Sequence, residues 1–394
     1  MTQTPHWLHD VALRQFLSAT RTAGGEARIV GGAVRDFLLG IDGGDIDMAS
    51  SLSPEQTINI AAEQGWKSIP TGLVHGTVTL VLPSRVIEVT TLRRDVATDG
   101  RHAVVAFTDC FQEDAARRDF TINALSMNAE GVIYDYFDGQ RDLAARRIRF
   151  IGDPATRIKE DGLRILRYFR FLATLGTPPA ERSALEACAQ YKSMIAQLSG
   201  ERIAAEMQKL LQAADPAYAL QQMSDIGLAP YLTHHEWARH ALFVWHFPIS
   251  EEVGPWVRLM ILVPPAERRL YAQWIAERWK LSRAQRDLLA YLAQQTDAVT
   301  TKMVKEWLRH ASHAWVDARL QLAIWDGALI EDMDIVLDVL HYWPIPDFPL
   351  TAEDLLARGY KQGKVLGDQL RRLEQQWVAS EYRLTKEALL AGLT

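Results

Sequence analysis

The sequence lacks the features of a membrane-spanning or secreted protein. None of its apolar runs reaches about 18 residues, the length that a helix needs to cross a bilayer. The opening MTQTPHWLHDVALRQFL shows none of the charged, apolar and cleavage regions of a signal peptide. We therefore expect a cytoplasmic protein with no membrane partner.

Cysteine is scarce, with two residues in a chain of 394. Cys110 and Cys188 form no CxxC pair and have no spacing typical of metal ligands, so neither a disulfide scaffold nor a zinc site is expected. Internal repeats and low-complexity segments are also missing. A hydrophobic content of 48% and a charged content of 23% instead indicate a globular chain that is too long for one ordinary domain.

Basic residues are fewer than acidic ones in the whole chain, but they outnumber the acidic ones in one segment. The net charge is −6, yet residues 141–170 carry nine basic and four acidic side chains, a local charge of +5. A basic stripe on an acidic protein suggests one anionic ligand bound at one place. A solvated helix face is the plainer alternative, and composition alone leaves both open.

Hydrophobic periodicity divides the chain into an α/β head and a helical remainder. In the head, short β-type runs at 27–31, 75–82 and 85–92 alternate with helical segments. After about residue 155, apolar residues recur at helical spacing between Pro, Gly or polar turns. The predicted domains are a head at 1–150, a helical neck at 151–215, and a helical body and tail at 216–394.

A glycine turn in the head is suited to binding phosphate. In RIVGGAVRDFLLG, a strand is followed by Gly31, Gly32 and a short helix, which leaves backbone N–H groups free at the helix N-terminus. Arg35, one turn into this helix, can reach the same anion with its planar guanidinium. The turn has neither the GxGxxG nor the GxxxxGK[ST] pattern, so neither a Rossmann nor a P-loop site is supported.

Two acids that follow this turn suggest a metal site. Asp45 and Asp47 are two residues apart, so on a strand both carboxylates point to one face. Like charges this close favour a bound cation, and hard oxygen ligands suit Mg²⁺ in phosphoryl transfer. Ala49 and Ser50 stand where an EF-hand calcium loop needs Asp or Asn and then Gly. Glu88 is a third candidate carboxylate, although a basic partner would explain it about as well.

Six motifs follow one another between about residues 28 and 211. They are GGAVRDFLLG, DID, IEVTTLRRD, EDAARRDFTINAL, EDGLRILRYFRF and ERIAAEMQKLL. Together they resemble the bacterial class II tRNA nucleotidyltransferases and their poly(A) polymerase relatives. The resemblance implies an α/β polymerase-β-like nucleotidyltransferase head followed by an all-α neck, body and tail. It implies template-independent addition of CMP, CMP and AMP, from CTP and ATP, to a tRNA lacking its 3′ CCA.

The resemblance also assigns roles to single residues. It implies that Asp119 and Asn123 fix the head against the neck, and that Glu160 fixes Arg164. Arg93 and Asp95 match the motif associated with ribose recognition. The catalytic residues expected are Asp45, Asp47 and Glu88, of which Asp45 and Asp47 are the ligands of Mg²⁺. The nucleotide-binding residues expected are Gly32, Arg35, Arg93, Asp95, Arg118, Asp161, Arg164, Arg167 and Arg170.

The segment EDGLRILRYFRF predicts how the base is chosen. Asp161, Arg164, Arg167 and Arg170 are spaced by three, which on one helix forms a slowly winding polar stripe. Cytosine and adenine show an amino donor beside a ring-nitrogen acceptor, whereas uracil and guanine show a carbonyl beside an N–H. The Asp161 carboxylate and the Arg164 guanidinium would pair with the first two bases and oppose the others. An intrahelical Asp161–Arg164 salt bridge is the plainer alternative.

The motifs leave several activities open. Poly(A) polymerase shares the head and neck motifs, and enzymes that add only CC or only A differ in a flexible loop, here 96–116, which looks complete. A silent RNA-binding homologue would not need Asp45 and Asp47. The C-terminal sequence resembles the tail of bacterial CCA-adding enzymes, where Lys361 and Lys364 would either meet tRNA phosphates or cover a plain turn.

Overall fold

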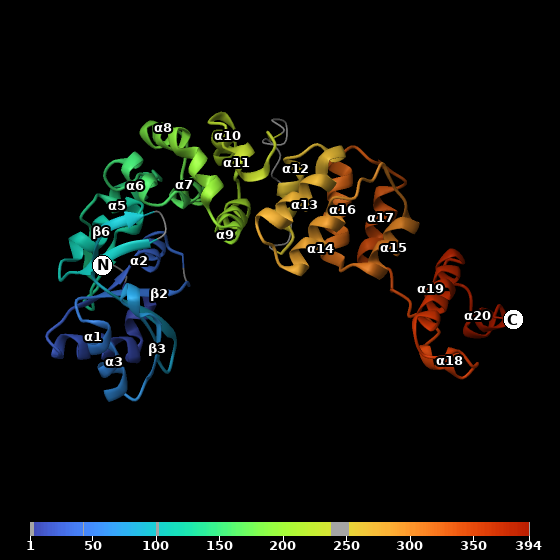
Figure 1. Ribbon diagram of the computed structural model, residues 1–394, viewed down its shortest axis with the longest axis horizontal. Coiled ribbons are helices and arrows are strands. Elements are labelled where there is room, and N and C mark those ends of the chain that lie inside the picture. The colour runs from blue at the N-terminus through green and yellow to red at the C-terminus, as the bar shows by residue number, and fades with distance from the viewer. Residues whose placement is uncertain (1–3, 42, 100–101, 238–251, 394) are drawn as a thin grey trace. The chain divides into compact units, whose positions relative to one another are not determined.

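The computed structural model describes residues 4–41, 43–99, 102–237 and 252–393 (Figure 1). For residues 95–99 and 102–105 it describes the backbone alone. The chain forms two compact units, of which the first contains most of the chain up to Arg286 and the second most of the chain after it. Among the residues described, no helix is both long and apolar enough to pass through a membrane.

The head is built on a mixed seven-stranded sheet of order β3-β4-β5-β2-β1-β8-β9. Strand β2 lies at its centre, antiparallel to β1 and parallel to β5. The predicted strands at 27–31, 75–82 and 85–92 are confirmed as β1, β4 and β5. The strands are β1 (Ala27–Val30), β2 (Ile46–Ser50), β3 (Lys67–Gly72), β4 (Thr77–Val81), β5 (Val86–Thr91), β8 (Ser126–Met127) and β9 (Ile133–Tyr134).

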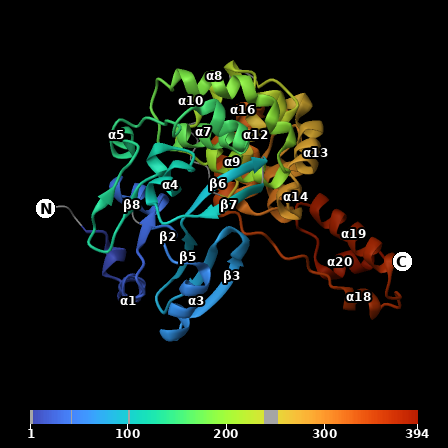
Figure 2. The same cartoon turned by 60° about the vertical axis from the view of Figure 1, so that its left-hand side comes forward.

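Two helices, α1 (Val11–Thr22) and α3 (Pro54–Glu63), form the core of the head with one face of this sheet (Figure 2). Met48 of β2 and Ile87 of β5 point into that core. Because side chains alternate along a strand, Asp47 and Glu88 point to the opposite face, where both are exposed. The alternation of these two strands thus places the acids outside the core.

The segment 96–116 is regular along most of its length, which corrects the expectation of a loop. Strand β6 (Arg93–Asp99) pairs antiparallel with β7 (His102–Phe107) in a separate two-stranded sheet. Helix α4 (Phe111–Ala116) follows. In this hairpin, the backbone groups that face the partner strand are hydrogen-bonded, whereas a loop of the same length would leave them to solvent.

The rest of the first unit is helical. Its helices are α2 (Gly32–Leu38) in the head, then α5 (Gly139–Ala144), α6 (Pro154–Glu160), α7 (Leu163–Thr174), α8 (Arg182–Tyr191), α9 (Gly200–Leu211), α10 (Ala217–Asp225) and α11 (Ala229–Thr233). Two further helices, α13 (Arg268–Arg278) and α14 (Arg283–Leu292), each contribute residues to both units. A mixed-sheet head and a mostly helical remainder match the predicted fold class.

The second unit is helical apart from one short ladder. Its helices are α12 (Gly254–Ile261), α15 (Thr301–His310), α16 (His313–Trp325), α17 (Met333–Tyr342), α18 (Ala352–Leu356), α19 (Lys364–Ala379) and α20 (Lys386–Ala391). Strands β10 (Ala298–Val299) and β11 (Leu329–Ile330) pair in parallel, so the expectation of an all-α remainder is wrong at these four residues. Such two-residue strands are too short for a period-2 pattern to reveal them.

The segment EDGLRILRYFRF is not one helix. Helix α6 ends at Glu160, α7 begins at Leu163, and Asp161 between them is extended, with φ −155°. The Asp161 carboxylate accepts a hydrogen bond from the backbone N–H of Leu163 at 3.0 Å, which satisfies a donor at the start of α7. The predicted single stripe is therefore wrong at Asp161, whereas the three arginines that follow do share α7.

Candidate active site

One cavity of about 450 Å³ gathers side chains from the head and the neck. This volume lies in the range of small-molecule sites. Eight of the predicted residues line it, namely Gly32, Arg35, Asp47, Arg118, Asp161, Arg164, Arg167 and Arg170. The other lining residues are Gly31, Arg117, Asp119, Asn123 and Phe171.

Three predicted residues, Asp45, Glu88 and Arg93, do not line the cavity, and a fourth, Asp95, has no described side chain. Glu88 is the register neighbour of Asp47 on β5, and Asp45 directly precedes β2. Arg93 donates from its guanidinium to the carbonyl oxygen of His75. Asp95 lies in β6 opposite Val105, and its side chain is outside the described residues. Of the two expected ribose contacts, Arg93 is therefore not brought into the cavity lining.

The glycine turn brings backbone close to a guanidinium. Gly31 precedes α2 with φ 68°, a conformation that favours glycine. A Cβ at this position would lie 3.0 Å from Nη1 of Arg118. The first N–H groups of α2 have no acceptor within the helix, so the turn offers donors and positive charge to a ligand in the cavity.

The Asp47 carboxylate lies where its negative charge is disfavoured. Although the Asp47 side chain is exposed, partial desolvation raises its pKa above the ordinary aspartate value, and the negative charges of Glu88 and Asp45 act in the same direction. Arg118 opposes this shift. Among the described residues, no three Asp, Glu, His or Cys side chains lie close enough together to form a metal site. A cation at Asp47 would therefore need further ligands from a substrate or water.

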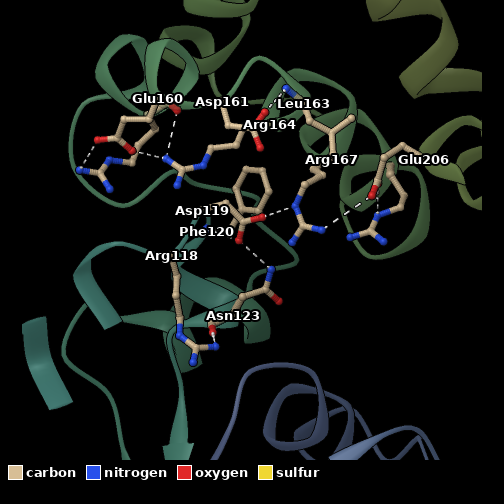
Figure 3. A network of polar contacts seen from close by, with 12 residues as sticks. Arg118, Asp119, Phe120, Asn123, Glu160, Asp161, Leu163, Arg164, Arg167 and Glu206 are labelled. Carbon is tan, nitrogen blue, oxygen red and sulfur yellow. Dashed lines mark hydrogen bonds and ion pairs between the residues drawn. The ribbon is translucent and has the colours of Figure 1, made fainter. Parts of the chain in front are cut away.

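A chain of hydrogen bonds joins the head to the neck (Figure 3). Arg35 Nη1 donates to Asn123 Oδ1 at 2.7 Å, and Asn123 Nδ2 donates to Asp119 Oδ1 at 3.1 Å. Arg167 Nε then donates to the other oxygen of Asp119 at 2.5 Å. Burial alone would raise the pKa of Asp119, but the charge of Arg167 and the hydrogen bonds from Arg167, Asn123 and the Phe120 N–H together outweigh burial and hold that pKa below its usual value. Asp119 thus makes the predicted link to the neck, whereas the side chain of Asn123 bonds Arg35 and Asp119 within the head.

The Arg164 guanidinium is fixed by three protein acceptors. Nη1 donates to Glu160 Oε2 at 2.5 Å and to the carbonyl oxygen of Arg157 at 3.0 Å, and Nη2 donates to the carbonyl oxygen of Arg117 at 3.0 Å. The expectation that Glu160 fixes Arg164 is confirmed. Because a guanidinium carries five N–H groups, Nε–H and one Nη2–H remain for a ligand.

Asp161 is oriented by a different helix. Its Oδ2 accepts a hydrogen bond from Arg202 Nη2 of α9 at 2.6 Å. Within the described chain, Arg164 pairs with Glu160 and Asp161 with Arg202, so the predicted alternative of an Asp161–Arg164 salt bridge is wrong. Both groups line the cavity as separately held donor and acceptor.

Phe171, which lines the cavity, and Glu206, which does not, contact the cavity arginines, and neither was predicted from the sequence. The guanidinium carbons of Arg170, Arg35 and Arg167 lie 4.1, 5.2 and 5.6 Å from the centre of the Phe171 ring. The buried Glu206 of α9 lies 3.1 Å from Arg170 Nε and 3.7 Å from Arg167 Nη1. Glu206 stands in the motif ERIAAEMQKLL, but only the packing of α9 on α7 brings it to these arginines.

Two family models match parts of the chain. Residues 27–149 match the poly A polymerase head domain, and residues 181–236 match the probable RNA and SrmB-binding site of polymerase A. Both matches agree with the resemblance found in the motifs. Since the head is common to several activities, the rest of the chain has to separate them.

Relatives that match nearly the whole chain distinguish between the activities that share this head. The chain is 35% identical to the mitochondrial CCA tRNA nucleotidyltransferase 1 of Danio rerio, over 94% of this chain and 87% of the relative. It is 31% identical to the CCA-adding enzyme of Bacillus velezensis, over 94% and 91%. The crystal structure of the Bacillus stearothermophilus CCA-adding enzyme in complex with CTP matches with a TM-score of 0.70 and 26% identity, over 94% and 93%. By identity and coverage, the chain belongs to the family of CCA tRNA nucleotidyltransferases.

Proposed function

We propose that this protein adds CMP, CMP and AMP, from CTP and ATP, to the 3′ end of a tRNA that lacks CCA. The observation that carries the proposal is the single cavity in which Asp47 and the glycine turn of the head meet Asp161 and Arg164 of the neck. Asp47 on one side and fixed base-edge partners on the other support nucleotidyl transfer from a nucleotide that the protein itself selects.

The head acids fit Mg²⁺ as the metal. Asp45 and Asp47 offer hard oxygen ligands, and the pKa of Asp47, raised mainly by desolvation, indicates a carboxylate whose charge Arg118 compensates only in part. Glu88, the register neighbour of Asp47, is the third proposed catalytic carboxylate. Two bound Mg²⁺ ions would stabilise the charge on the attacking and leaving oxygens. The acids themselves hold the negative charge that attracts the ions to this face of the sheet.

The arginines of the cavity fit a triphosphate. Gly32 and Arg118 lie at the glycine turn, and Arg35, Arg167 and Arg170 surround Phe171. Their carboxylate partners hold each guanidinium in place, which lowers the entropy cost of binding a phosphate chain. Arg93 and Asp95 lie on β6 and are the proposed ribose contacts, although Arg93 does not line the cavity.

Asp161 and Arg164 fit the Watson–Crick edges of cytosine and adenine. The Asp161 carboxylate would accept from the amino group, and a free N–H of Arg164 would donate to the ring nitrogen. With uracil or guanine, the Asp161 carboxylate would face a carbonyl oxygen, which is also an acceptor, and the Arg164 N–H would face a ring N–H, which is also a donor. Such unpaired polar groups can support discrimination of about 10⁴.

We also propose that the chain divides into a head (1–150), a neck (151–215), and a body and tail (216–394). RNA would contact residues 181–236 and the tail. The proposed location is cytoplasmic. The 181–236 contact is supported by the RNA-binding-site model that this segment matches.

The test is to incubate the protein with tRNA lacking CCA, CTP and ATP, and to sequence the 3′ ends. Tails that end in a single CCA support the proposal. A long A tail indicates a poly(A) polymerase, and ends that stop at CC, or that gain A only on tRNA already ending in CC, indicate a partial activity. Unchanged ends with intact RNA binding indicate a silent homologue.

A further inference from the structure

A second cavity, of about 420 Å³, lies between the end of α5 and the segment that joins α7 to α8. We call it the arginine groove. It shares no lining residue with the nucleotide cavity, and it contains basic residues of the 141–170 window that the nucleotide site leaves unused. Its basic and acidic lining residues are Arg141, Arg146, Arg147, Arg182 and Glu181.

The groove has an excess of positive charge, because four guanidiniums face one carboxylate. Arg147 Nε donates to the buried Asp142 carboxylate at 2.8 Å, whose other oxygen accepts from Arg149 at 2.8 Å. Arg182 pairs with Glu186 at 2.7 Å. Arg141 and Arg146 are exposed and have no carboxylate partner within the described part of the chain. These two side chains are free to bind an external anion.

The backbone holds the groove in one shape. Arg146 follows α5 with φ 52°, and its carbonyl oxygen accepts a hydrogen bond from the Thr177 N–H of the opposite wall at 3.0 Å. The Arg147 N–H donates to the carbonyl oxygen of Asp142 at 2.8 Å. Pro178 and Pro179 stiffen the far wall because their φ angles are fixed. A preformed site of this kind costs little ordering entropy when a ligand binds.

We infer that the arginine groove binds backbone phosphates of RNA. Guanidiniums without acidic partners around a concave surface suit phosphate oxygens, which they contact through paired N–H groups. None of the described residues that line the groove is aromatic, so a base has nothing there on which to stack, and the chemistry of the groove fits a backbone and not a nucleoside. Its far wall, at Glu181 and Arg182, begins the segment 181–236 proposed above to contact RNA. The inference rests on the proposed function, which supplies the RNA.

The test compares the protein with the double variant Arg141→Ala/Arg146→Ala. Arg147 is kept, since its loss would weaken the pairing of the buried Asp142. The matched control is Lys67→Ala, which removes an exposed cation from β3 in the same unit. Binding of tRNA lacking CCA is measured at several salt concentrations, together with the KM for CTP.

In the double variant, the Kd for tRNA should rise about tenfold or more near 0.1 M salt, and the salt slope should fall by roughly 1 for each phosphate that the variant no longer binds. The control should match the parent, and the KM for CTP should stay unchanged. If the parent adds CCA but the double variant keeps the parent's tRNA Kd and salt slope, the inference is overturned and the proposed function is not. A change in CTP binding without a change in tRNA binding overturns it too, because the groove then serves free nucleotide. A parent that neither binds nor extends tRNA overturns the proposed function as well.

Discussion

The Asp47 carboxylate occupies a position that disfavours its charge. Desolvation and the nearby Glu88 raise its pKa above the value of about 3.8 for an unperturbed aspartate. Because the folded-state pKa is the higher one, ionisation of Asp47 lowers the free energy of unfolding as the pH rises from the unfolded value through the folded value. The ionised Asp47 carboxylate can bind a cation, but its charge lowers the free energy of unfolding of the metal-free protein.

We therefore predict that Asp47→Asn raises the melting temperature at pH 7 without Mg²⁺, while it abolishes nucleotide addition. The gain should shrink at about pH 3, below the unperturbed aspartate value, where the carboxyl gains a proton in both the folded and the unfolded protein. Calorimetry at both pH values checks this, with Glu63→Gln, an exposed acid of α3, as the control. A melting temperature at pH 7 that is lower than or equal to that of the parent would contradict the electrostatic account, and retained addition would contradict the metal role.

The sequence identified many of the residues that line the site, but it did not identify the residues that hold them in place. Asp161, Arg164 and the α7 arginines were found from spacing and resemblance, and they do line one cavity. Arg202 and Glu206, which orient them, lie on α9 about 40 residues away in the chain. A spacing pattern reports neighbours on one helix. It carries no information on which face of another helix packs against them.

At the scale of elements, the break between α6 and α7 decides where Asp161 points. The chain can pass close to Met194 at this break because residue 162 is glycine. A Cβ at position 162 would lie 2.9 Å from the Cβ of Met194. The period of three through 161, 164, 167 and 170 favoured one continuous helix. The signal against it was the glycine, which costs about 1 kcal/mol inside a helix and is also typical of a boundary.

We predict that Gly162→Ala destabilises the protein by about 1–3 kcal/mol, since the new methyl group meets a Cβ that cannot rotate away. It should also lower incorporation of both C and A, because it displaces the neighbouring Asp161. Chemical denaturation and single-nucleotide addition measure the two effects. Met194→Gly, which removes the contacted atom, should recover part of both losses. Unchanged stability in Gly162→Ala would show that space at this position is not limiting.

Over the whole molecule, periodicity predicted the division into a mixed-sheet head and a helical remainder. The hairpin β6–β7 and the ladder β10–β11 were missed. Both depend on pairing between segments whose local sequence does not require it. The matches to relatives over most of the chain then supplied the family, which the head motifs shared with poly(A) polymerase could not decide.

The tail offers a prediction about tRNA binding. Lys361 and Lys364 are exposed beside Gly363, whose φ is 140°. If they meet tRNA phosphates, Lys361→Ala/Lys364→Ala should raise the KM for tRNA about tenfold near 0.1 M salt and leave the KM for CTP unchanged. Point variants are preferable to deletion of 348–394, which would also remove Glu374 from the buried Arg309. An unchanged KM for tRNA would mean that the lysines only cover a turn.

The measurement that tests the central claim most directly is the nucleotide preference of Asp161→Ala. Rates of addition of C, A, U and G to tRNA lacking CCA and to tRNA ending in CC are compared in the parent, in Asp161→Ala, and in Glu186→Gln, which changes an exposed acid outside the cavity. The account predicts that Asp161→Ala lowers addition of C and A and relaxes the rejection of UTP and GTP, with triphosphate binding largely intact. If Asp161→Ala still rejects UTP and GTP as strongly as the parent, the protein does not select the base through this carboxylate.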